Sequence, residues 1–435
     1  MNKVYFHTLG CKVNQYDSQA MLEQFLTHGY QQVSKPEEAD VCVINTCTVT
    51  TTADKKSLQI ANRQKKLNEH CELIITGCMS QSRSTELLST GARLILGTQF
   101  RSHIVTLLDK AIADNIQLVA VESLDVAGFE NLQVSGHNAH TRAVMKIQEG
   151  CNYNCSYCII PSVRGRIRSR LLSDIEAEAK SLARGGYKEI VLTGINLSCY
   201  GEDLGTHDLC DVVDCLNAIT GIRRIRISSL EPNLVTESIA ARLCANEKLC
   251  PHFHLALQAG SDNVLHAMRR RYNTARFRKS VDILRKNFPH CAITTDIIVG
   301  FPTETDADFD ATKRFVKEMD FQKIHVFPFS PRKGTDAASL PQTAPEVKKQ
   351  RARELIAISE ALAKDIYAKT LGKVYNVLIE EQTADRAWKG FTEDYMPVKV
   401  EGNFHSGDIV RTRILEVKKN LLIGKEVGYE QLHFL

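Results

Sequence analysis

The segment Cys151-Asn-Tyr-Asn-Cys155-Ser-Tyr-Cys158 places three thiols within a short stretch, directly after an apolar, strand-like run over residues 143–147. Thiolates are the soft ligands that zinc and iron–sulfur clusters prefer. A structural zinc site requires a fourth Cys or His at a comparable spacing, and the nearest histidines are not arranged in that way. Three ligands would leave one metal atom of a cluster open to a further ligand.

The apolar pattern around this segment predicts a partial β/α barrel. Helical stretches separate six strand-like runs, at residues 143–147, 189–192, 224–228, 253–257, 292–299 and 323–327. Six β/α units fit a partial barrel better than an eightfold one. Barrels of this kind hold their reactive groups at the carboxyl ends of the strands, which is where the three cysteines lie.

The length of 435 residues predicts about three domains at roughly 150 residues each, and the fold class is α/β. Residues 1–122 alternate apolar runs with amphipathic stretches, as in a parallel α/β sheet, and a polar linker is expected over 123–139. Residues 140–371 form the barrel, whose last part, 344–371, is a long bracing helix. Short strands over 372–435 predict a small β-barrel.

The composition is that of an ordinary globular chain, with 43% hydrophobic and 24% charged residues and a net charge of +4. Neither a disordered chain nor a polybasic tail is compatible with these values. No apolar run approaches the length of a membrane span, and Val4-Tyr5-Phe6 opens a strand and not a signal peptide. We therefore expect a cytoplasmic protein with no membrane partner, in which some of the 14 cysteines bind metal or perform redox chemistry.

A second trio of cysteines follows three strand-like runs of the first region. Cys11, Cys47 and Cys78 each come shortly after such a run. If the strands are parallel, their carboxyl ends meet at one edge of the sheet, where open α/β folds gather ligands. The spacing alone leaves coincidence and a site equally open. We interpret the other eight cysteines as packing residues: Cys42, Cys71, Cys199, Cys210, Cys215, Cys244, Cys250 and Cys291.

These motifs resemble those of known families. The Cx3Cx2C segment resembles the signature of the radical S-adenosylmethionine (SAM) superfamily, in which the open iron of a 4Fe–4S cluster binds SAM and one electron cleaves it to a 5′-deoxyadenosyl radical. The segments TLGCKVNQYDS (8–18), NTCTVT (45–50) and TGCMSQ (76–81) resemble the N-terminal domain of the methylthiotransferase family, and residues 372–435 resemble a TRAM module. The likeness covers essentially the whole chain.

The resemblance implies two 4Fe–4S clusters. Cys151, Cys155 and Cys158 would hold the radical SAM cluster, and Cys11, Cys47 and Cys78 an auxiliary one. The residues that it implies around SAM are Tyr157 against the adenine, Arg270 on the carboxylate, and the strand-end residues Thr193, Gly194, Asn196, Ser229, Glu231 and Gln258. An arginine suits a carboxylate because its guanidinium pairs both oxygens. Each of these could instead be an ordinary strand-end or cap residue.

The segment Gly10-Cys11-Lys12-Val13-Asn14 most resembles the branch of the family that acts on N6-threonylcarbamoyladenosine at tRNA position 37. The product would be the 2-methylthio derivative. Replacing the hydrogen at adenine C2 is beyond general acid–base catalysis, which supplies about 10²–10⁴-fold. The family mechanism uses two SAM molecules per turnover: one methylates a cluster-bound sulfur, and the other yields the radical that removes the hydrogen.

The implied partners are the tRNA anticodon stem-loop, a reductant such as a flavodoxin or ferredoxin, and a sulfur donor. No side chain beyond the clusters is expected to be catalytic, although Asn14, Asp17 and Asn45 are candidates for managing protons. Four alternatives remain: an isopentenyladenosine tRNA methylthiotransferase, a ribosomal-protein aspartate methylthiotransferase, a radical SAM enzyme whose auxiliary cluster only transfers electrons, and a non-catalytic, metal-stabilised RNA-binding protein.

Two basic runs flank the expected centre and predict a phosphate path toward it, namely Arg164, Arg166, Arg168 and Arg170, and Lys55, Lys56, Arg63, Lys65 and Lys66. In the last domain, stacking on unpaired bases is possible for Trp388, Phe391 and Tyr395, with Arg411 and Arg413 on phosphates, but core packing explains the aromatic residues equally well. The segment Ser330-Pro-Arg332-Lys-Gly334-Thr is either a loop over the active site, as the family implies, or a solvated turn.

Overall fold

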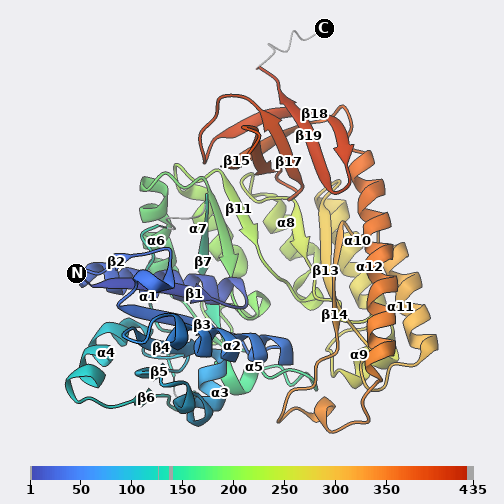
Figure 1. Ribbon diagram of the computed structural model, residues 1–435. Helices are drawn as coiled ribbons and strands as arrows, with labels where there is room; N and C mark the ends of the chain where they lie inside the picture. The colour runs from blue at the N-terminus through green and yellow to red at the C-terminus, as the bar shows by residue number, and fades with distance from the viewer. Residues whose placement is uncertain (1, 126, 137–140, 429–435) are drawn as a thin grey trace.

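The computed structural model describes residues 2–125, 127–136 and 141–428. Position 126 and positions 137–140, in and beside the expected linker, and positions 429–435, at the end of the expected β-barrel, lie outside the described residues. Three structural regions follow one another along the chain (Figure 1). Within the described ranges, every helix falls short of the length or the apolar character needed to span a lipid bilayer.

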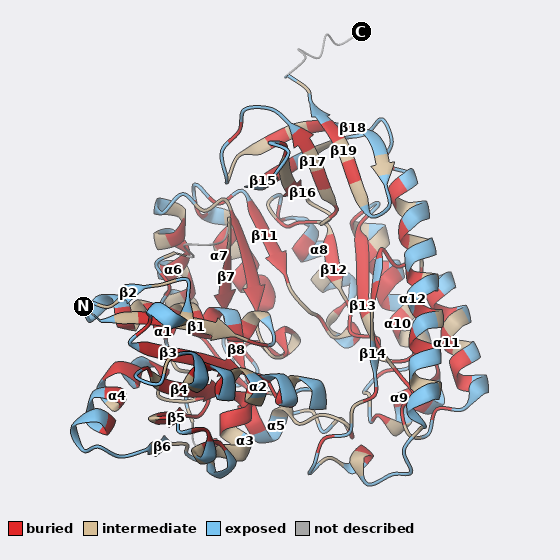
Figure 2. Cartoon of the chain, in the orientation of Figure 1, coloured by how far each residue is buried: buried red, intermediate tan, exposed pale blue. Residues whose placement is uncertain are grey.

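The first region is a parallel six-stranded sheet in the order β2-β1-β3-β4-β5-β6. Its strands are β1 (Lys3–Thr8), β2 (Gln31–Gln32), β3 (Val41–Thr46), β4 (Glu72–Gly77), β5 (Leu94–Leu96) and β6 (Leu118–Ala120). Its helices are α1 (Lys12–Thr27), α2 (Thr51–Leu67), α3 (Cys78–Leu87) and α4 (Ile104–Ala113). Strand β3 is buried throughout, because α1 and α4 cover one face of the sheet and α2 and α3 the other. Figure 2 shows β3, β4 and β5, the inner strands of this sheet, as mostly buried.

The central region confirms the expected six-stranded partial barrel. One half is β7 (Arg142–Lys146), β10 (Glu189–Thr193) and β11 (Arg224–Ile227), and the other is β12 (His252–His254), β13 (Ala292–Val299) and β14 (Lys323–Pro328). Isolated bridges join the halves at Ile225 with Leu249 and at Leu230 with Leu255. Strand β12 ends earlier than expected, because the chain beyond it pairs only through such single bridges.

Helices cover the outside of this barrel, namely α6 (Leu172–Arg184), α7 (Leu209–Ala218), α8 (Glu237–Cys244), α9 (Asp262–Ala267), α10 (Thr274–Asn287), α11 (Asp306–Glu318) and α12 (Pro345–Ala368). Ile190 and Leu192 of β10 point outward into the same core as Ile175 and Leu182 of α6. The alternating residues Glu189, Val191 and Thr193 therefore face the barrel interior. The interior is open between β7 and β14, which do not pair with each other.

The N-terminal domain covers this open side. Helix α1 packs against β7 at one edge of the opening. At the other edge, the backbone N–H of Thr51 at the start of α2 donates to Oγ of Ser330 in the loop after β14, at 2.9 Å. The N-terminal domain therefore contacts the barrel at both edges of its opening.

The last region is the expected small β-barrel. Strands β15 (Val374–Gln382), β16 (Trp388–Phe391), β17 (Pro397–Glu401), β18 (Ile409–Lys418) and β19 (Leu421–Glu426) close in the order β15-β16-β17-β19-β18. The domain contacts the beginnings of the central strands, through an Arg142–Glu380 ion pair at 2.6 Å and a hydrogen bond from Arg224 to the Phe391 carbonyl at 3.2 Å. It lies at the end of the barrel opposite the cysteines.

Candidate functional site

The loop Cys151–Cys158 is held at the carboxyl end of β7 by a tight approach of backbone to backbone. Gly150 has φ +71°, and a Cβ there would come within 1.9 Å of the Arg166 carbonyl oxygen, so only glycine fits. The N–H of Cys151 donates to the carbonyl of Gly165 at 3.0 Å. The cysteine loop is therefore closed onto the end of α5 (Ile160–Arg164).

The three thiols of this loop are half-buried and face hydrogen-bond donors. Nη1 of Arg270 lies 3.2 Å from Sγ of Cys155, and Nδ2 of Asn196 lies 3.8 Å from Sγ of Cys151. Burial raises the pKa of Cys158 to about 12, with the neighbouring Cys155 and Cys151 adding to the effect. Such thiols stay protonated until a metal stabilises the thiolate, and donors aimed at sulfur suit an anionic cluster.

A cavity next to this loop brings together five of the eight residues expected around SAM. Its lining includes the three cysteines together with Tyr157, Asn196, Ser229, Glu231 and Arg270. Thr193, Gly194 and Gln258 do not line it: Thr193 is buried at the end of β10, and a Cβ on Gly194 would lie 2.9 Å from the Gln148 side chain. The placement of the five fits a ligand seated against the cysteine loop.

Arg270 is already paired within this cavity. Its Nη2 lies 2.5 Å from each carboxylate oxygen of Glu231, and its Nε lies 3.0 Å from the Tyr272 hydroxyl. A SAM carboxylate could reach the guanidinium only by sharing it with Glu231 or by displacing Glu231. Arg270 and Glu231 therefore form one unit and are not independent contacts.

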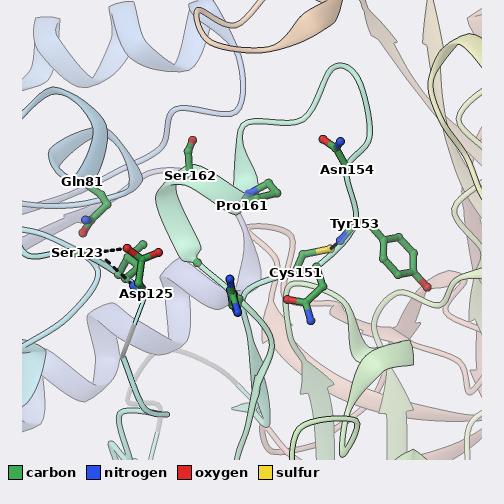
Figure 3. Close-up of a pocket in the computed structure, with 12 residues that line it drawn as sticks. Gln81, Ser123, Asp125, Cys151, Tyr153, Asn154, Pro161 and Ser162 are labelled. Carbon is green, nitrogen blue, oxygen red and sulfur yellow. Dashed lines mark hydrogen bonds between the residues drawn. The ribbon is translucent and has the colours of Figure 1, made fainter.

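A larger cavity, of about 660 Å³, adjoins the same loop (Figure 3). Cys151 and Tyr153 line both cavities. The larger one extends to Gln81 of α3, the helix that begins at Cys78. It therefore connects the cysteine loop of the barrel with the N-terminal domain.

The second cysteine trio is gathered at one edge of the N-terminal sheet. Cys11 is the N-cap of α1, Cys47 directly follows β3, and Cys78 is the first residue of α3. Burial, together with the charges of Cys78 and Cys11, raises the pKa of Cys47 to about 11, so the three sulfurs are electrostatic neighbours. A Cβ on Gly10, which has φ +101°, would lie 2.9 Å from Cβ of Cys47. Glycine thus lets the first and second cysteine segments meet.

The spacing of both trios argues against a single zinc ion. Thiolates bind zinc at about 2.3 Å in a tetrahedron, which brings the sulfurs to about 3.8 Å from one another. In the described ranges, only His254, Asp296 and His325 place three potential ligand atoms within 4.8 Å of one another. The three sulfur atoms of neither trio all lie within that distance of one another. The two sets of thiols therefore fit a larger inorganic cluster better than a single ion.

A buried charged group joins the two trios, and it contains all three candidates for proton management. Arg164 of α5 donates from Nε to Sγ of Cys78 at 3.1 Å, from Nη1 to Asp17 at 3.0 Å, and from Nη2 to Oδ1 of Asn14 at 2.5 Å. Asn45 donates to the Asn14 carbonyl at 3.0 Å. Burial alone would raise the pKa of Asp17, but Arg101, Lys146 and Arg164 lower it. These side chains position the domains relative to each other.

Three sequence comparisons match successive parts of the chain. Residues 3–97 match "Uncharacterized protein family UPF0004", residues 145–316 match the radical SAM superfamily, and residues 368–427 match the TRAM domain. The threonylcarbamoyladenosine tRNA methylthiotransferase MtaB of Bacillus subtilis (strain 168) is 39% identical, over 96% of this chain and 94% of its own length. This chain belongs to the radical SAM tRNA methylthiotransferase family.

Other relatives carry two names. The enzyme named threonylcarbamoyladenosine tRNA methylthiotransferase MtaB from Aquifex aeolicus (strain VF5) is 36% identical over 95% of this chain and 100% of its own length. A tRNA-2-methylthio-N(6)-dimethylallyladenosine synthase from Sulfurihydrogenibium sp. (strain YO3AOP1) is 33% identical over 98% and 99%. Among solved structures, the radical SAM methyltransferase TsrM from Kitasatospora setae has a TM-score of 0.55 and 13% identity, over 78% of this chain and 77% of that chain. That likeness shows the fold alone.

The methylthiotransferase structure corrects the predicted phosphate path along the first basic run. Arg164, Arg168 and Arg170 are buried, and only Arg166 is exposed. Arg170 pairs with the buried Glu178 at 2.7 Å. The partners of these arginines come from the N-terminal domain and from α6, and the local pattern of arginines at every second position does not reveal this. Four members of the second run, Lys55, Lys56, Arg63 and Lys66, are exposed on or near one surface of α2.

The interpretation of Ser330–Thr335 as a solvated turn is contradicted at Arg332, although Pro331, Lys333 and Gly334 are exposed. Arg332 is buried, and its Nη2 donates to Asp54 of α2 at 2.5 Å and to the Thr48 hydroxyl at 2.8 Å. Both acceptors follow Cys47 closely in the sequence. The loop after β14 is therefore attached to the segment that follows Cys47.

Base stacking by Phe391 and Tyr395 is also contradicted. Their rings stack on each other at 4.8 Å, and the guanidinium of Arg142 lies over both rings, 5.0 and 4.9 Å from the centroids. Arg226 lies 4.6 Å from the Tyr395 ring. These aromatic residues attach the TRAM domain to the base of the barrel. Of the eight cysteines expected to pack, Cys215 is only partly buried and Cys244 is exposed, donating to the Asn287 carbonyl at 2.9 Å.

Two further residues of the site were not predicted to have a place in it. Gln148 is buried, accepts from the N–H of Asn196 at 2.7 Å and donates to the carbonyls of Glu149 and Gly150 at 2.8 Å, which fixes the strand end beside the cysteine loop. Lys12 is the first residue of α1. Burial, with Arg142 and Arg226, lowers the pKa of Lys12 to about 8. Its position next to Cys11 could have drawn attention to it.

Proposed function

We propose that this methylthiotransferase converts N6-threonylcarbamoyladenosine at tRNA position 37 to its 2-methylthio derivative. The observation that carries the proposal is that one residue, Arg164, contacts an N-terminal cysteine while lying in the helix that follows the radical SAM cysteines. The two cysteine sets are thus linked through α5. The substrate follows the relatives at 39% and 36% identity over nearly the whole chain, which are named for threonylcarbamoyladenosine.

Two clusters and two SAM molecules complete the proposed enzyme. The radical SAM family implies a 4Fe–4S cluster and SAM, for which Cys151, Cys155 and Cys158 are the ligands. Cys11, Cys47 and Cys78 would hold a second 4Fe–4S cluster. When bound, these groups supply a radical that removes hydrogen from adenine C2 and a methylated sulfur that replaces it.

The chain's own residues bind and orient SAM and shield the site from water. Asn196, Glu231 and Arg270 offer polar contacts to the amino acid part of SAM, and Tyr157 offers an aromatic face. The network around Arg164 and Asp17 is almost fully buried, so it excludes water between the two cysteine sets and keeps their relative position fixed. Asn14 and Asn45 have roles in that network.

The macromolecular partners follow from the same arrangement. The anticodon stem-loop would approach over α2, where Lys55, Lys56 and Lys66 are exposed beside the auxiliary cysteines, and the TRAM domain would add RNA contacts. Cys11 is exposed, so a sulfur donor can reach the auxiliary site from its side. A flavodoxin or ferredoxin would supply electrons. A tRNA substrate also supports a cytoplasmic location.

Mass spectrometry of nucleosides tests the substrate. In tRNA from a strain that lacks the gene, 2-methylthio-N6-threonylcarbamoyladenosine should disappear while N6-threonylcarbamoyladenosine remains. A normal level of the methylthiolated nucleoside would refute the proposal. Anaerobic reconstitution should give about eight irons per chain, from two clusters of four.

The second candidate is methylthiolation of N6-isopentenyladenosine, which a relative at 33% identity with nearly complete coverage favours by its name. The same nucleoside digest separates the two. Loss of 2-methylthio-N6-isopentenyladenosine, with the threonylcarbamoyl derivative unchanged, would establish the second candidate in place of the first.

A further inference from the structure

Three neighbouring strands of the barrel bring two histidines and an aspartate together on one face. His254 ends β12, Asp296 lies within β13, and His325 lies within β14. Parallel pairing sets Asp296 beside His325, and it sets His254 beside Thr294, which shares the face of Asp296 because side chains alternate along a strand. Ile297, the next residue after Asp296, belongs to the core beneath the outer helices. The two histidines and the aspartate therefore face the barrel interior.

The ligand atoms of these three half-buried side chains lie close enough to share one metal ion. Nε2 of His254 lies 3.4 Å from Oδ2 of Asp296, and one ligand atom from each of the three residues lies within 4.8 Å of those of the other two. Two donors bound to a zinc ion at about 2.0–2.1 Å in a tetrahedron are about 3.3 Å apart. His254 and Asp296 already have this separation, and a small rotation of the His325 side chain would add the third ligand.

The His254 ring is held on its other side by a hydroxyl group. Its Nδ1 lies 3.0 Å from Oγ1 of Thr294, which is buried. An imidazole that binds a metal almost always donates from its other ring nitrogen to a protein acceptor or to water, which fixes the tautomer and the orientation of the ring. Thr294 can accept that bond, and the lone pair of Nε2 then points toward Asp296.

The composition of the set selects the class of ion. Two imidazole nitrogens and one carboxylate oxygen suit zinc and similar divalent transition metals, whereas calcium and magnesium prefer oxygen ligands alone. Some catalytic zinc sites use two histidines and one carboxylate and keep a fourth position for water or substrate. Lys323, two residues before His325, adds a positive charge near this face, but it is exposed and therefore largely screened by solvent.

We propose that His254, Asp296 and His325 bind one divalent transition-metal ion of the zinc class and leave one coordination position open toward the barrel interior. This site goes beyond the proposed function, because neither the two clusters nor the tRNA substrate requires it. A bound ion would link β12, β13 and β14, and β14 borders the opening of the barrel. Its open position would accept an oxygen or nitrogen atom of a molecule that enters there.

Zinc binding by the reconstituted protein tests the site. Anaerobic reconstitution with iron and sulfide fills the cysteine sites first, and the protein is then dialysed against zinc that a chelator holds at a low free concentration. Plasma mass spectrometry should find about one zinc per chain. X-ray absorption at the zinc edge should show nitrogen and oxygen neighbours at about 2.0–2.1 Å, without the sulfur neighbours at about 2.3 Å that cysteine-bound zinc would give.

Variants then assign the zinc to these side chains. Asp296→Asn and His325→Gln each replace one ligand by an amide of similar size, and each should lose the zinc and keep the iron. Thr294→Val keeps the three ligands and removes only the hydroxyl beside His254, so zinc affinity should fall by about 10- to 100-fold. His266→Gln is the matched control, because His266 is exposed on α9, and this variant should keep the zinc.

The outcomes separate the metal site from the proposed function. Absence of bound zinc in the unaltered protein, or sulfur neighbours around it, would overturn the site, as would equal zinc contents in the unaltered protein, Asp296→Asn and His325→Gln. If a variant loses iron together with zinc, its fold is disturbed, and the absorption spectrum of the unaltered protein decides. A protein that methylthiolates tRNA without binding zinc would refute the site alone. A protein that binds zinc through nitrogen and oxygen but leaves tRNA unmodified would refute the function alone.

Discussion

Nε of Arg164 lies 3.1 Å from Sγ of Cys78, although the two residues belong to different domains. Burial raises the pKa of the Cys78 thiol, and the charge of Arg164 opposes this effect. The same guanidinium contacts Asp17 and Glu149. One side chain thus stabilises a thiolate of the N-terminal trio and fastens that trio to the helix next to the barrel cysteines.

Replacing Arg164 by methionine should destabilise the protein strongly. Arg164 is fully buried, and its loss leaves Asp17 and Glu149 with fewer counterions. Breaking a buried ion pair from one side costs about 3–5 kcal/mol, and the remaining partners Arg101 and Lys146 place the expected loss near the lower value. Denaturant unfolding of the metal-free protein measures it.

Arg166→Met is the matched control, because Arg166 is exposed only two residues away. A surface substitution of this kind changes the free energy of unfolding by about 0.5 kcal/mol or less. Equal stabilities for the two variants would show that the buried charged group does not hold the domains together.

The two cysteine sets should fail in different ways. Cys155→Ala removes a proposed cluster ligand from the smaller cavity and should abolish 5′-deoxyadenosine formation. Cys47→Ala leaves that cavity intact, so SAM cleavage should stay detectable while methylthio transfer stops. Chromatography of the SAM products, with the iron content of each variant, measures both effects.

Each of these two variants should retain about four of about eight irons. Cys42→Ala is the control: Cys42 is buried within β3 away from the trio and should keep both clusters. Loss of SAM cleavage in Cys47→Ala to the level of Cys155→Ala would contradict separate roles for the two sets.

The sequence was sufficient for the architecture and for the grouping of the cysteines. Each of Cys11, Cys47 and Cys78 follows a strand, and parallel pairing of β1, β3 and β4 necessarily brings those strand ends together. Strand periodicity and position along the chain carry that information. The same logic located the loop of Cys151 after the first barrel strand.

Contacts between domains could not be predicted in this way. Arg164 and Arg170 stand in a basic run typical of a phosphate-binding surface, yet both are buried against acidic partners distant in sequence. Phe391 and Tyr395 suggested base stacking, but their rings instead pack against the guanidinium groups of Arg142 and Arg226 of the barrel. Such pairings depend on how the folded domains pack against each other, and the periodicity of the local sequence carries no information about that packing.

The Asp308 carboxylate, in the capping box at the start of α11, should stabilise the folded protein by an amount that is lost in acid. Burial raises the pKa of Asp308, but hydrogen bonds from Ser261 and Thr305 outweigh it and lower the pKa to about 2. Because the folded pKa is below the unfolded one, the increment is present above about pH 4 and is lost as the pH falls toward 2.

Asp308→Asn should therefore destabilise the metal-free protein by about 1–2 kcal/mol at pH 7, the usual range for a lost cap. The difference from the unaltered protein should shrink when urea unfolding is repeated near pH 3. A difference that stays constant over this range would mean that the carboxylate charge is not what stabilises the helix start.

The lysines of α2 should contact RNA phosphates. Lys55 and Lys56 are exposed on α2, the helix that follows Cys47. Neutralising a phosphate releases counterions, so the logarithm of affinity falls with the logarithm of salt by about 0.7 to 0.9 per contact. The double variant Lys55→Ala/Lys56→Ala should bind an anticodon stem-loop more weakly and show a salt slope smaller by about 1 to 2.

The matched double variant Lys110→Ala/Lys180→Ala removes the same charge from α4 and α6, on other faces of the protein, and should keep the original slope. Because the total charge changes equally in both, an equal reduction of the two slopes would trace the effect to net charge and would rule out α2 as the phosphate-binding surface.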